Sequence, residues 1–324
     1  MDGQSPETAG RRADTLANHG WRWPSSPDLA LLERVAGLQT LCLTLAGAIG
    51  ALVLCAWLVP AIDPLLFPGW ALMKANTALL ILLSAASLAL SRSEAVAPRR
   101  ISQALAAVVA LVAVIMLLEY LSRFSFGMDT WLAADRGSPR PGRMSPQTAT
   151  ALLLLGIIEF FIRAKGRKAS LVVDLLAFCL CPLVMVIVSG YAFGVLRFFG
   201  LSTATRTSPH TLVALMLLSF VAFSRRAEIG IYSVLAGPGI GSRIARIAVP
   251  FTLVTPFVLE AVRFSMVKAG IVSAPYATAL VTVTAAVLGF AIILLLALRI
   301  DSLEQEIREL SLRDQLTGLY NRRG

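Results

Sequence analysis

Charged side chains are scarce in this chain of 324 residues. Asp, Glu, Lys and Arg together make up 15% of it, whereas a soluble globular domain carries about 25%. No charged residue lies between Val35 and Ile62 or between Ala269 and Leu298. An uncharged apolar run of more than about 18 residues can cross a bilayer as a helix. This composition excludes a soluble globular enzyme for most of the chain.

Cysteine and histidine are also few, which argues against a metal or haem site. The four cysteines lie in two apolar runs, at positions 42 and 55 and at positions 179 and 181. Residues two apart on a helix point in different directions, so Cys179 and Cys181 are a poor pair of metal ligands. No disulfide framework is expected. Of the two histidines, His19 and His210, one lies near a membrane segment, which is too few for a bis-histidine haem.

The apolar runs predict an all-α fold, a polytopic membrane helical bundle of about eight transmembrane helices. Eight segments of the chain have the required composition: 37–59, 73–91, 101–121, 146–163, 172–194, 209–224, 246–266 and 276–299. The polar residues 1–36 lack the short apolar core of a secretory signal. We expect them to form a disordered cytoplasmic tail.

The distribution of basic residues predicts the orientation of these segments. With the N-terminus inside, 20 Lys and Arg fall on the inner side and nine on the outer side, as the positive-inside rule requires. Both termini are then cytoplasmic, and the lipid bilayer is the first expected partner. This sidedness accounts for the net charge of +10, so no nucleic-acid partner is needed to explain it.

A short motif recurs at the starts of the second, fourth, sixth and eighth segments. It reads Lys74-Ala-Asn-Thr77, Ser145-Pro-Gln-Thr148, Ser208-Pro-His-Thr211 and, more faintly, Ala274-Pro-Tyr-Ala277. The spacing suggests four helical-hairpin repeats of parallel orientation. The alternative is that Pro, Ser and Thr recur because they start helices well. In either case four helices begin at the outer face, where their positive dipole ends attract anions.

Ionisable side chains at similar depth form a candidate ligand site at the outer face. Intramembrane ionisable groups often have functional roles, and the candidates are Lys74, Glu119, Arg123, Arg197, His210, Glu260 and Arg263. The expected stimulus is a small anion or polar molecule. The alternative is structural: the pairs Glu119–Arg123 and Glu260–Arg263 neutralise one another.

After the last apolar segment, residues 300–313 have the pattern of a short cytoplasmic coiled-coil helix. Ile300, Leu303, Ile307 and Leu310 follow 3-4-3 spacing with charged residues between them, which is typical of a coiled-coil seam. No Pro or Gly interrupts the chain from Phe290 to Arg313. We therefore expect the last membrane helix to continue unbroken into this rod.

The final residues resemble the D-x-L-T-G-L-x-N-R-R segment that opens the GGDEF domain of diguanylate cyclases. The matching residues are Asp314, Leu316, Thr317, Gly318, Leu319, Asn321, Arg322 and Arg323. More loosely, Gly127-Met-Asp129 and Arg143-Met-Ser-Pro146 are similar to fragments of the multi-span sensor regions found ahead of such domains. The Met-His-Tyr-Thr run of one such sensor class is absent.

This resemblance implies a bacterial inner-membrane sensory module that regulates a C-terminal diguanylate cyclase, which converts GTP to cyclic di-GMP. It also implies a parallel homodimer along the coiled-coil seam of residues 300–310. The expected domains are the tail 1–36, a sensor 37–299, the signalling helix 300–313 and the start of a GGDEF domain, 314–324. GTP and Mg²⁺ are expected only for the cyclase domain. This chain lacks the family's catalytic motif, so no enzymatic activity is expected of it. The alternatives are a transporter or channel, and a ligand-free membrane anchor and dimeriser.

Overall fold

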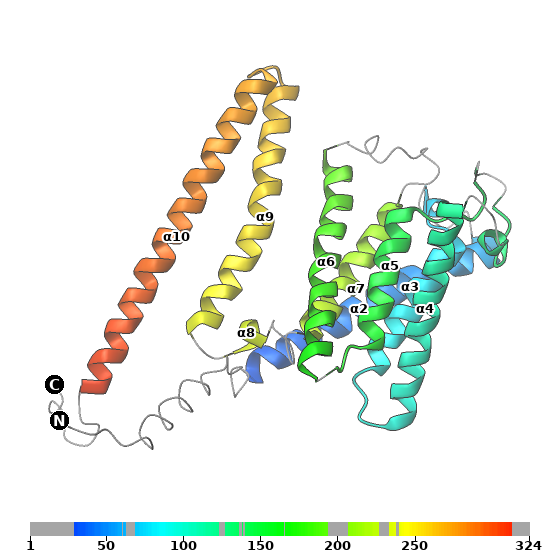
Figure 1. The fold of residues 1–324 in the computed structure, drawn as a ribbon. Helices are drawn as coiled ribbons and strands as arrows, with labels where there is room; N and C mark the ends of the chain where they lie inside the picture. The colour runs from blue at the N-terminus through cyan, green and yellow to red at the C-terminus, as the bar shows by residue number, and fades with distance from the viewer. Residues whose placement is uncertain are drawn as a thin grey trace, which may run out of the picture.

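All regular structure in the described part of the chain is helical (Figure 1). The computed structural model describes residues 29–59, 61–62, 69–122, 127–135, 138, 140–164, 166–193, 207–226, 233–237 and 240–312. The long helices are α2 (Leu29–Leu58), α3 (Ala75–Leu90), α4 (Val96–Ser122), α5 (Pro146–Phe160), α6 (Arg167–Ala192), α7 (Pro209–Arg226), α9 (Ile240–Lys268) and α10 (Ala274–Leu312). The short elements are η2 (Trp70–Leu72), η3 (Met128–Thr130) and α8 (Ser233–Ala236). Each apolar segment predicted from the sequence coincides with one long helix, and the all-α prediction is confirmed for these residues.

Six of the helices, α2 to α7, form one bundle with an inner and an outer layer. The inner helices α3, α5 and α7 all pack against one another. Each outer helix lies over two of them: α2 on α3 and α7, α4 on α3 and α5, and α6 on α5 and α7. The hydrophobic core consists of buried residues from these six helices together with Met73 and Met144. The bundle is therefore three helical hairpins arranged around a shared axis.

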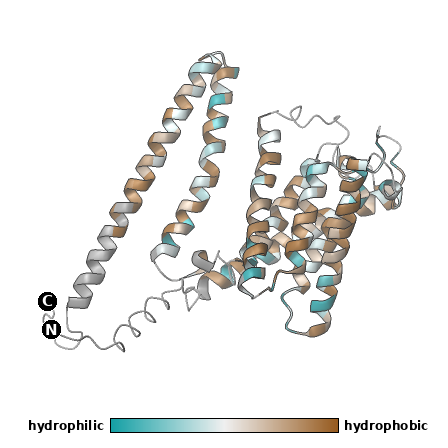
Figure 2. Ribbon diagram, viewed as in Figure 1, coloured by the Kyte–Doolittle hydropathy of each residue, from teal (hydrophilic) through white to brown (hydrophobic). Residues whose placement is uncertain are grey.

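Five helices are long and apolar enough to cross a membrane, namely α2, α4, α6, α9 and α10. Apolar residues predominate along these helices (Figure 2). The three inner helices are shorter, with 16, 15 and 18 residues. At 1.5 Å per residue they reach about 22–27 Å, less than a hydrocarbon core of about 30 Å. The structure thus supports a helical membrane protein with five spans by length, rather than the eight predicted from composition.

Two glycines allow helices of one hairpin to approach closely. A Cβ atom added to Gly50 of α2 would lie 2.9 Å from the Ala78 carbonyl oxygen of α3. A Cβ atom added to Gly156 of α5 would lie 2.8 Å from the Ala110 amide nitrogen and 3.0 Å from the Ala106 carbonyl oxygen of α4. These distances leave no room for a side chain. Backbone contact at these glycines therefore sets the distance between α2 and α3, and between α4 and α5.

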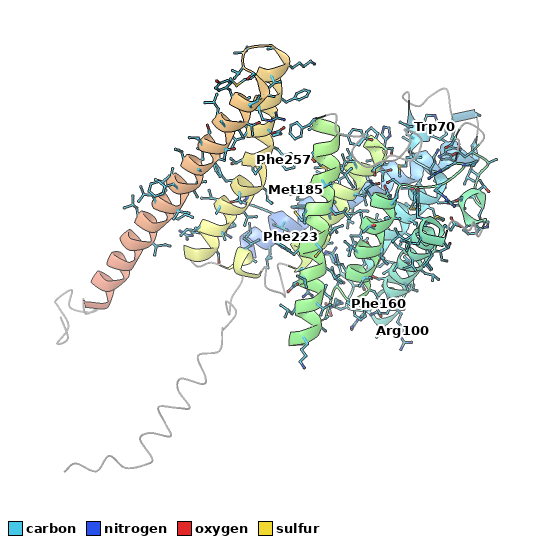
Figure 3. All side chains as sticks on the ribbon, turned by 45° about the horizontal axis from the view of Figure 1, so that its top comes forward. Trp70, Arg100, Phe160, Met185, Phe223 and Phe257 are labelled. Atoms are coloured by element: carbon cyan, nitrogen blue, oxygen red, sulfur yellow. The ribbon has the colours of Figure 1, made fainter. Side chains whose placement is uncertain are left out.

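The fourth hairpin, α9 and α10, stands apart from the bundle (Figure 1). The two helices pack on each other. In the most apolar 18-residue stretch of each helix, no residue is buried within the described structure. An aromatic contact joins this hairpin to the bundle: Phe257 of α9, which is labelled in Figure 3, stacks on Phe193 at the end of α6, with ring centroids 6.5 Å apart. The α9–α10 hairpin therefore does not pack into the bundle as the other three hairpins do.

The first helix begins earlier in the chain than the sequence predicted, whereas the last helix is continuous, as predicted. α2 begins at Leu29, which lies inside the range 1–36 that was expected to be a disordered tail. The apolar residues from Leu29 to Leu32 extend the helix in this direction. Residues 1–28 lie outside the described residues. α10 continues without a break for 39 residues, which confirms that the last apolar segment runs on as helix through position 312. The side chains of Leu303, Ile307 and Leu310 and all of 313–324 lie outside the described part.

Replacing Gly156 with Ala is expected to destabilise the bundle. The added methyl group would overlap the α4 backbone, and overpacking of this kind costs about 1–3 kcal/mol. Gly37→Ala in α2 is the matched control, because a Cβ atom there meets no atom within 4 Å and Ala favours helix by about 1 kcal/mol. Thermal unfolding of the purified protein should show a lower midpoint for Gly156→Ala alone. Equal midpoints would contradict the close approach of α4 and α5.

Candidate functional site

The three inner helices begin side by side at one end of the bundle, each with a residue of the recurring motif at its cap. At α5, Ser145 Oγ accepts a hydrogen bond from the Thr148 backbone N–H at 3.1 Å. At α7, Ser208 Oγ accepts the corresponding bond from Thr211 at 3.1 Å. Such caps satisfy N–H groups that have no partner within the helix. At α3 the cap position is held by Lys74, whose side chain makes no capping bond.

An aromatic side chain at the end of each outer helix fixes the start of the neighbouring inner helix. Each donates a hydrogen bond to the backbone carbonyl just before the cap residue: Trp57 Nε1 to Met73 at 2.8 Å, Tyr120 Oη to Met144 at 2.7 Å, and Tyr191 Oη to Thr207. Each donor lies within the last three residues of its helix. The C-terminal end of each of the helices α2, α4 and α6 therefore lies level with the start of the helix that follows it.

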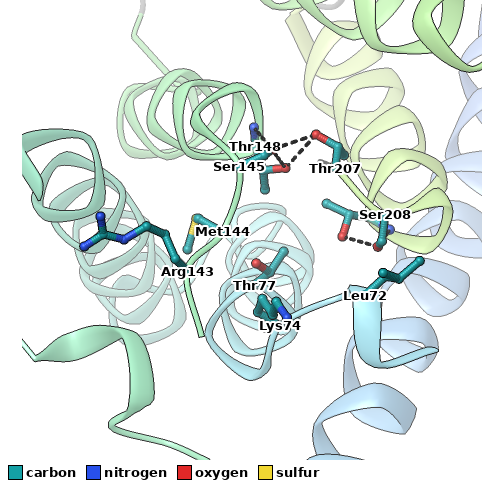
Figure 4. Close-up of a pocket in the computed structure, with 10 residues that line it drawn as sticks. Leu72, Lys74, Thr77, Arg143, Met144, Ser145, Thr148, Thr207 and Ser208 are labelled. Atoms are coloured by element: carbon teal, nitrogen blue, oxygen red, sulfur yellow. Dashed lines mark hydrogen bonds between the residues drawn. The ribbon is translucent and has the colours of Figure 1, made fainter. Parts of the chain in front are cut away.

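A small pocket, with room inside for about one water molecule, lies where the three helices begin (Figure 4). Its hydroxyl lining comes from Thr77, Ser145, Thr148, Thr207, Ser208 and Thr211. The Thr207 hydroxyl lies 2.7 Å from Ser145 Oγ and 3.1 Å from Thr148 Oγ1, so it links the start of α7 to the cap of α5. Lys74 and Arg143 also line the pocket. Hydroxyl groups both donate and accept, which suits a small polar ligand.

Lys74 is neutralised by a carboxylate from the loop between α4 and α5. Its Nζ lies 2.7 Å from Asp135 Oδ2, and both side chains are buried. Asp135 also accepts the Gly142 backbone N–H at 2.9 Å. Gly142 has φ +67°, and a Cβ atom there would lie 1.7 Å from the Asp129 carbonyl oxygen. Only glycine fits such a position, so this loop is held tightly against the bundle.

Arg143 is the centre of a second ionic cluster beside the pocket. Its guanidinium lies 2.9 Å from Asp129 Oδ2 and 3.2 Å from Glu119 Oε2, and 5.3 Å from the centroid of the Tyr120 ring. Burial opposes the charge of Arg143, but the hydrogen bond and charge of Asp129, together with the charge of Glu119, raise the pKa of the guanidinium above its ordinary value. The cluster therefore carries full charges held in place by one another.

The structure divides the predicted ligand residues between two places. Lys74, Glu119 and His210 lie at the outer end of the bundle. Glu260 and Arg263 form an ion pair with each other on α9, which is outside the bundle, so they do not join the others. Arg123 and Arg197 lie outside the described residues.

The partners of Lys74 and Glu119 were missed from the sequence. Glu119 pairs with Arg143, whereas the sequence suggested Arg123, which lies outside the described residues; Lys74 pairs with Asp135. These partners are 24 and 61 residues away in the chain, and no local pattern links them. In the sequence, Asp129 and Arg143 stand out only because they belong to the two short fragments that are similar to multi-span sensor regions.

A third ionic group closes the opposite end of the bundle. Arg226, at the end of α7, is fully buried and lies 2.6 Å from Asp174 Oδ1 of α6. It also donates to the carbonyls of Ile162, Ala164 and Ser170. Arg225 reaches the other way, to Gln39 of α2 and Ser91 at the end of α3. Two consecutive arginines therefore join α7 to both neighbouring sides of the bundle.

The chemistry available at the outer pocket is polar binding. Within the described residues, no group of three or more His, Cys, Asp or Glu side chains is arranged to hold a metal ion. No family model, curated protein or solved structure shows significant similarity to this chain. The function must therefore be argued from the geometry itself.

Replacing Arg143 with Met should destabilise the outer end of the bundle. The change leaves Glu119, which is 0% exposed, without its positive partner, and breaking a buried ion pair costs about 3–5 kcal/mol. The double variant Arg143→Met/Glu119→Gln should recover part of the lost stability, because the stranded charge is gone. Arg263→Met is the control, because the ion pair of Arg263 with Glu260 is more exposed and should contribute much less to stability. Thermal unfolding in detergent measures all three, and an equal loss for Arg143→Met and Arg263→Met would contradict the buried cluster.

Proposed function

We propose that this protein is a bacterial inner-membrane sensory module that regulates a C-terminal diguanylate cyclase domain through a dimeric coiled coil. The observation that carries the proposal is the uninterrupted α10. At 1.5 Å per residue its 39 residues span about 58 Å, roughly twice the hydrocarbon core. A helix of this length extends beyond the membrane toward the segment that resembles a GGDEF domain. GTP and Mg²⁺ belong to that cyclase domain.

The proposed topology has eight crossings, with both termini cytoplasmic. Length alone does not favour crossings by α3, α5 and α7, but their position does. These three helices pack on one another and against α2, α4 and α6. Protein covers nearly all of α3 and α5, whereas Val213, Met216 and Phe220 of α7 are exposed. A helix covered mostly by protein does not need a full-length apolar surface. The end of the bundle that holds Arg163, Arg225 and Arg226 is the cytoplasmic end in this proposal.

The proposed origin of the bundle is duplication of one hairpin. The first three hairpins share a cap residue, a Thr three positions later, and an aromatic donor to the carbonyl before the cap. Helix-starting preference accounts for Ser and Pro at the caps, but it does not account for the aromatic donors. The fourth hairpin has Ala274 and Ala277 at the motif positions and has diverged furthest.

The dimer is proposed to form along α10. Counting back from Ile300 in the same 3-4 spacing, the seam passes through Leu296 and Ile293 and reaches Gly289, Ala286 and Thr282. Gly289 faces open space, and Ala286 and Thr282 are exposed. Small residues at such positions allow two membrane helices to approach closely. The coiled-coil pattern and the small-residue face therefore lie on one continuous side of α10.

The stimulus is proposed to act at the outer end, where the pocket gathers hydroxyl groups from all three hairpins. A small polar molecule or anion bound there would contact α3, α5 and α7 together. The contact between Phe193 and Phe257 offers a route from α6 to α9, and α9 packs directly on α10.

Cysteine cross-linking in membranes tests the dimer. In a variant with Cys42, Cys55, Cys179 and Cys181 replaced by Ala, Leu303→Cys should form a disulfide between two copies. Gln305→Cys is the control, because it lies on the opposite side of the helix from the seam. Oxidation followed by non-reducing electrophoresis should give a dimer band several-fold stronger for Leu303→Cys. Bands of equal strength would rule out this seam.

A change of helical register tests the relay. With the chain placed ahead of a diguanylate cyclase domain, deletion of Gln305 should change cyclic di-GMP output at least several-fold, since it rotates everything that follows by about 100°. Insertion of a second copy of 300–306 keeps the seven-residue register and should leave output close to that of the parent. Unchanged output after the deletion would exclude a rigid-rod relay.

A further inference from the structure

Glu159, in the last turn of α5, is a buried carboxyl group that the outer site does not use. Its exposure is 1%. Neither carboxyl oxygen has a hydrogen-bond partner among the described residues, and neither has Ser84 Oγ. The residue lies at the end of the bundle opposite to the pocket, one turn before Arg163. A polar side chain buried without a partner is unusual and requires an explanation.

The groups around Glu159 are uncharged. From α3, the hydroxyls of Ser84 and Ser87 face it, without hydrogen-bond geometry to either carboxyl oxygen. Ser87 is instead engaged with Ser102 of α4: each hydroxyl donates to the other residue's carbonyl oxygen, at 3.0 and 2.8 Å. Glu159 is therefore surrounded by serine hydroxyls at the junction of α3, α4 and α5.

The charged groups of the neighbouring helices are engaged elsewhere. α3 has no charged residue between its bounds, and on α4 the nearest, Arg99 and Arg100, are exposed. On α6 and α7, Asp174 pairs with Arg226 and Arg225 contacts Gln39 and Ser91. Arg163, beyond α5, pairs with Glu94. Among the residues that the structure describes, no cationic side chain lies within 4 Å of Glu159.

An ionised carboxylate in such surroundings is disfavoured, because burial removes its hydration and no positive charge replaces it; the neighbouring serine hydroxyls offset only part of this cost. A protonated carboxyl is neutral and has an O–H to donate, and the unpartnered Ser84 hydroxyl is an acceptor within reach. We propose that Glu159 is a proton-binding site, protonated in the packed bundle, and that release of its proton to water at the cytoplasmic end loosens the junction of α3, α4 and α5.

The position of Glu159 makes it suited to control packing. Gly156, one turn earlier, is where the α5 backbone meets that of α4 most closely. A negative charge at Glu159 draws water toward this contact, and the tight approach cannot admit water without separating the helices. The site thus couples proton concentration on the cytoplasmic side to the packing of the bundle. The cytoplasmic placement of the site rests on the proposed topology, but the inference does not depend on a cyclase domain or on a ligand at the outer pocket.

Infrared spectroscopy of the full chain in lipid tests the proton directly. At neutral pH the wild-type protein should show the C=O absorption of a protonated carboxylic acid, and Glu159→Gln should lack that band. Glu94→Gln is the matched control, because Glu94 lies at the same end of the bundle with its side chain 88% exposed, and it should keep the band. Absence of the band from the wild type, or its persistence in Glu159→Gln, would overturn the proposal.

The pH dependence of unfolding gives a second readout. Glu159 must keep its proton in the folded state, whereas an exposed glutamate in the unfolded chain ionises near pH 4.3. Rising pH therefore disfavours the folded wild type. Its unfolding equilibrium constant should increase relative to that of Glu159→Gln by up to about tenfold per pH unit, while Glu94→Gln should follow the wild type. Parallel profiles for wild type and Glu159→Gln would overturn the proposal.

A replacement variant and a test with Na⁺ complete the experiment. If Glu159→Gln does not fold, Ser84→Ala replaces it: loss of the facing hydroxyl should shift the frequency of the acid band, and an unshifted band counts against the site. Stabilisation of the wild type by Na⁺ but not by choline at equal ionic strength, without an acid band, would show a metal cation in place of the proton and overturn the proposal.

Discussion

The start of a helix in an apolar environment needs partners for its free N–H groups, and this constraint organises the bundle. Lipid supplies no hydrogen bonds, so the protein must provide them at the outer ends of α3, α5 and α7. Ser145 and Ser208 do so at two helices, and aromatic donors fix the preceding carbonyls at all three. Satisfying these groups draws three helix starts together, and the hydroxyl-lined pocket is the space between them.

The buried charges follow the same constraint. Lys74 is paired with Asp135 and Arg143 with Asp129 and Glu119, so the loop between α4 and α5 is tied down at the outer end. Arg226 and Asp174 perform the equivalent task at the other end. Glu159 is the contrast, since it is buried without an opposite charge. Paired charges fix helices in one arrangement, while a lone carboxyl makes the packing depend on a proton.

The fourth hairpin plays a different part from the other three. It shares little surface with the bundle, and its apolar residues remain available to lipid or to a second copy. Its second helix is the longest in the described chain and leads to the C-terminal segment. A rigid bundle joined through few contacts to a long exposed hairpin is an arrangement in which a change at α6 can move α9 and α10 without unfolding the core.

The sequence by itself determined the elements of this protein. Uncharged runs located every long helix, and the absence of Pro and Gly after Phe290 predicted the continuous α10, because helix formation depends on local pattern. The motif located the starts of the inner helices. The sequence did not reveal that α3, α5 and α7 pack together as an inner layer, that α9 lies outside the bundle, or that Arg143 meets Glu119 while Glu159 meets no cation. Only the tertiary structure decided these points, because they depend on contacts between residues far apart in the chain, which no local pattern encodes.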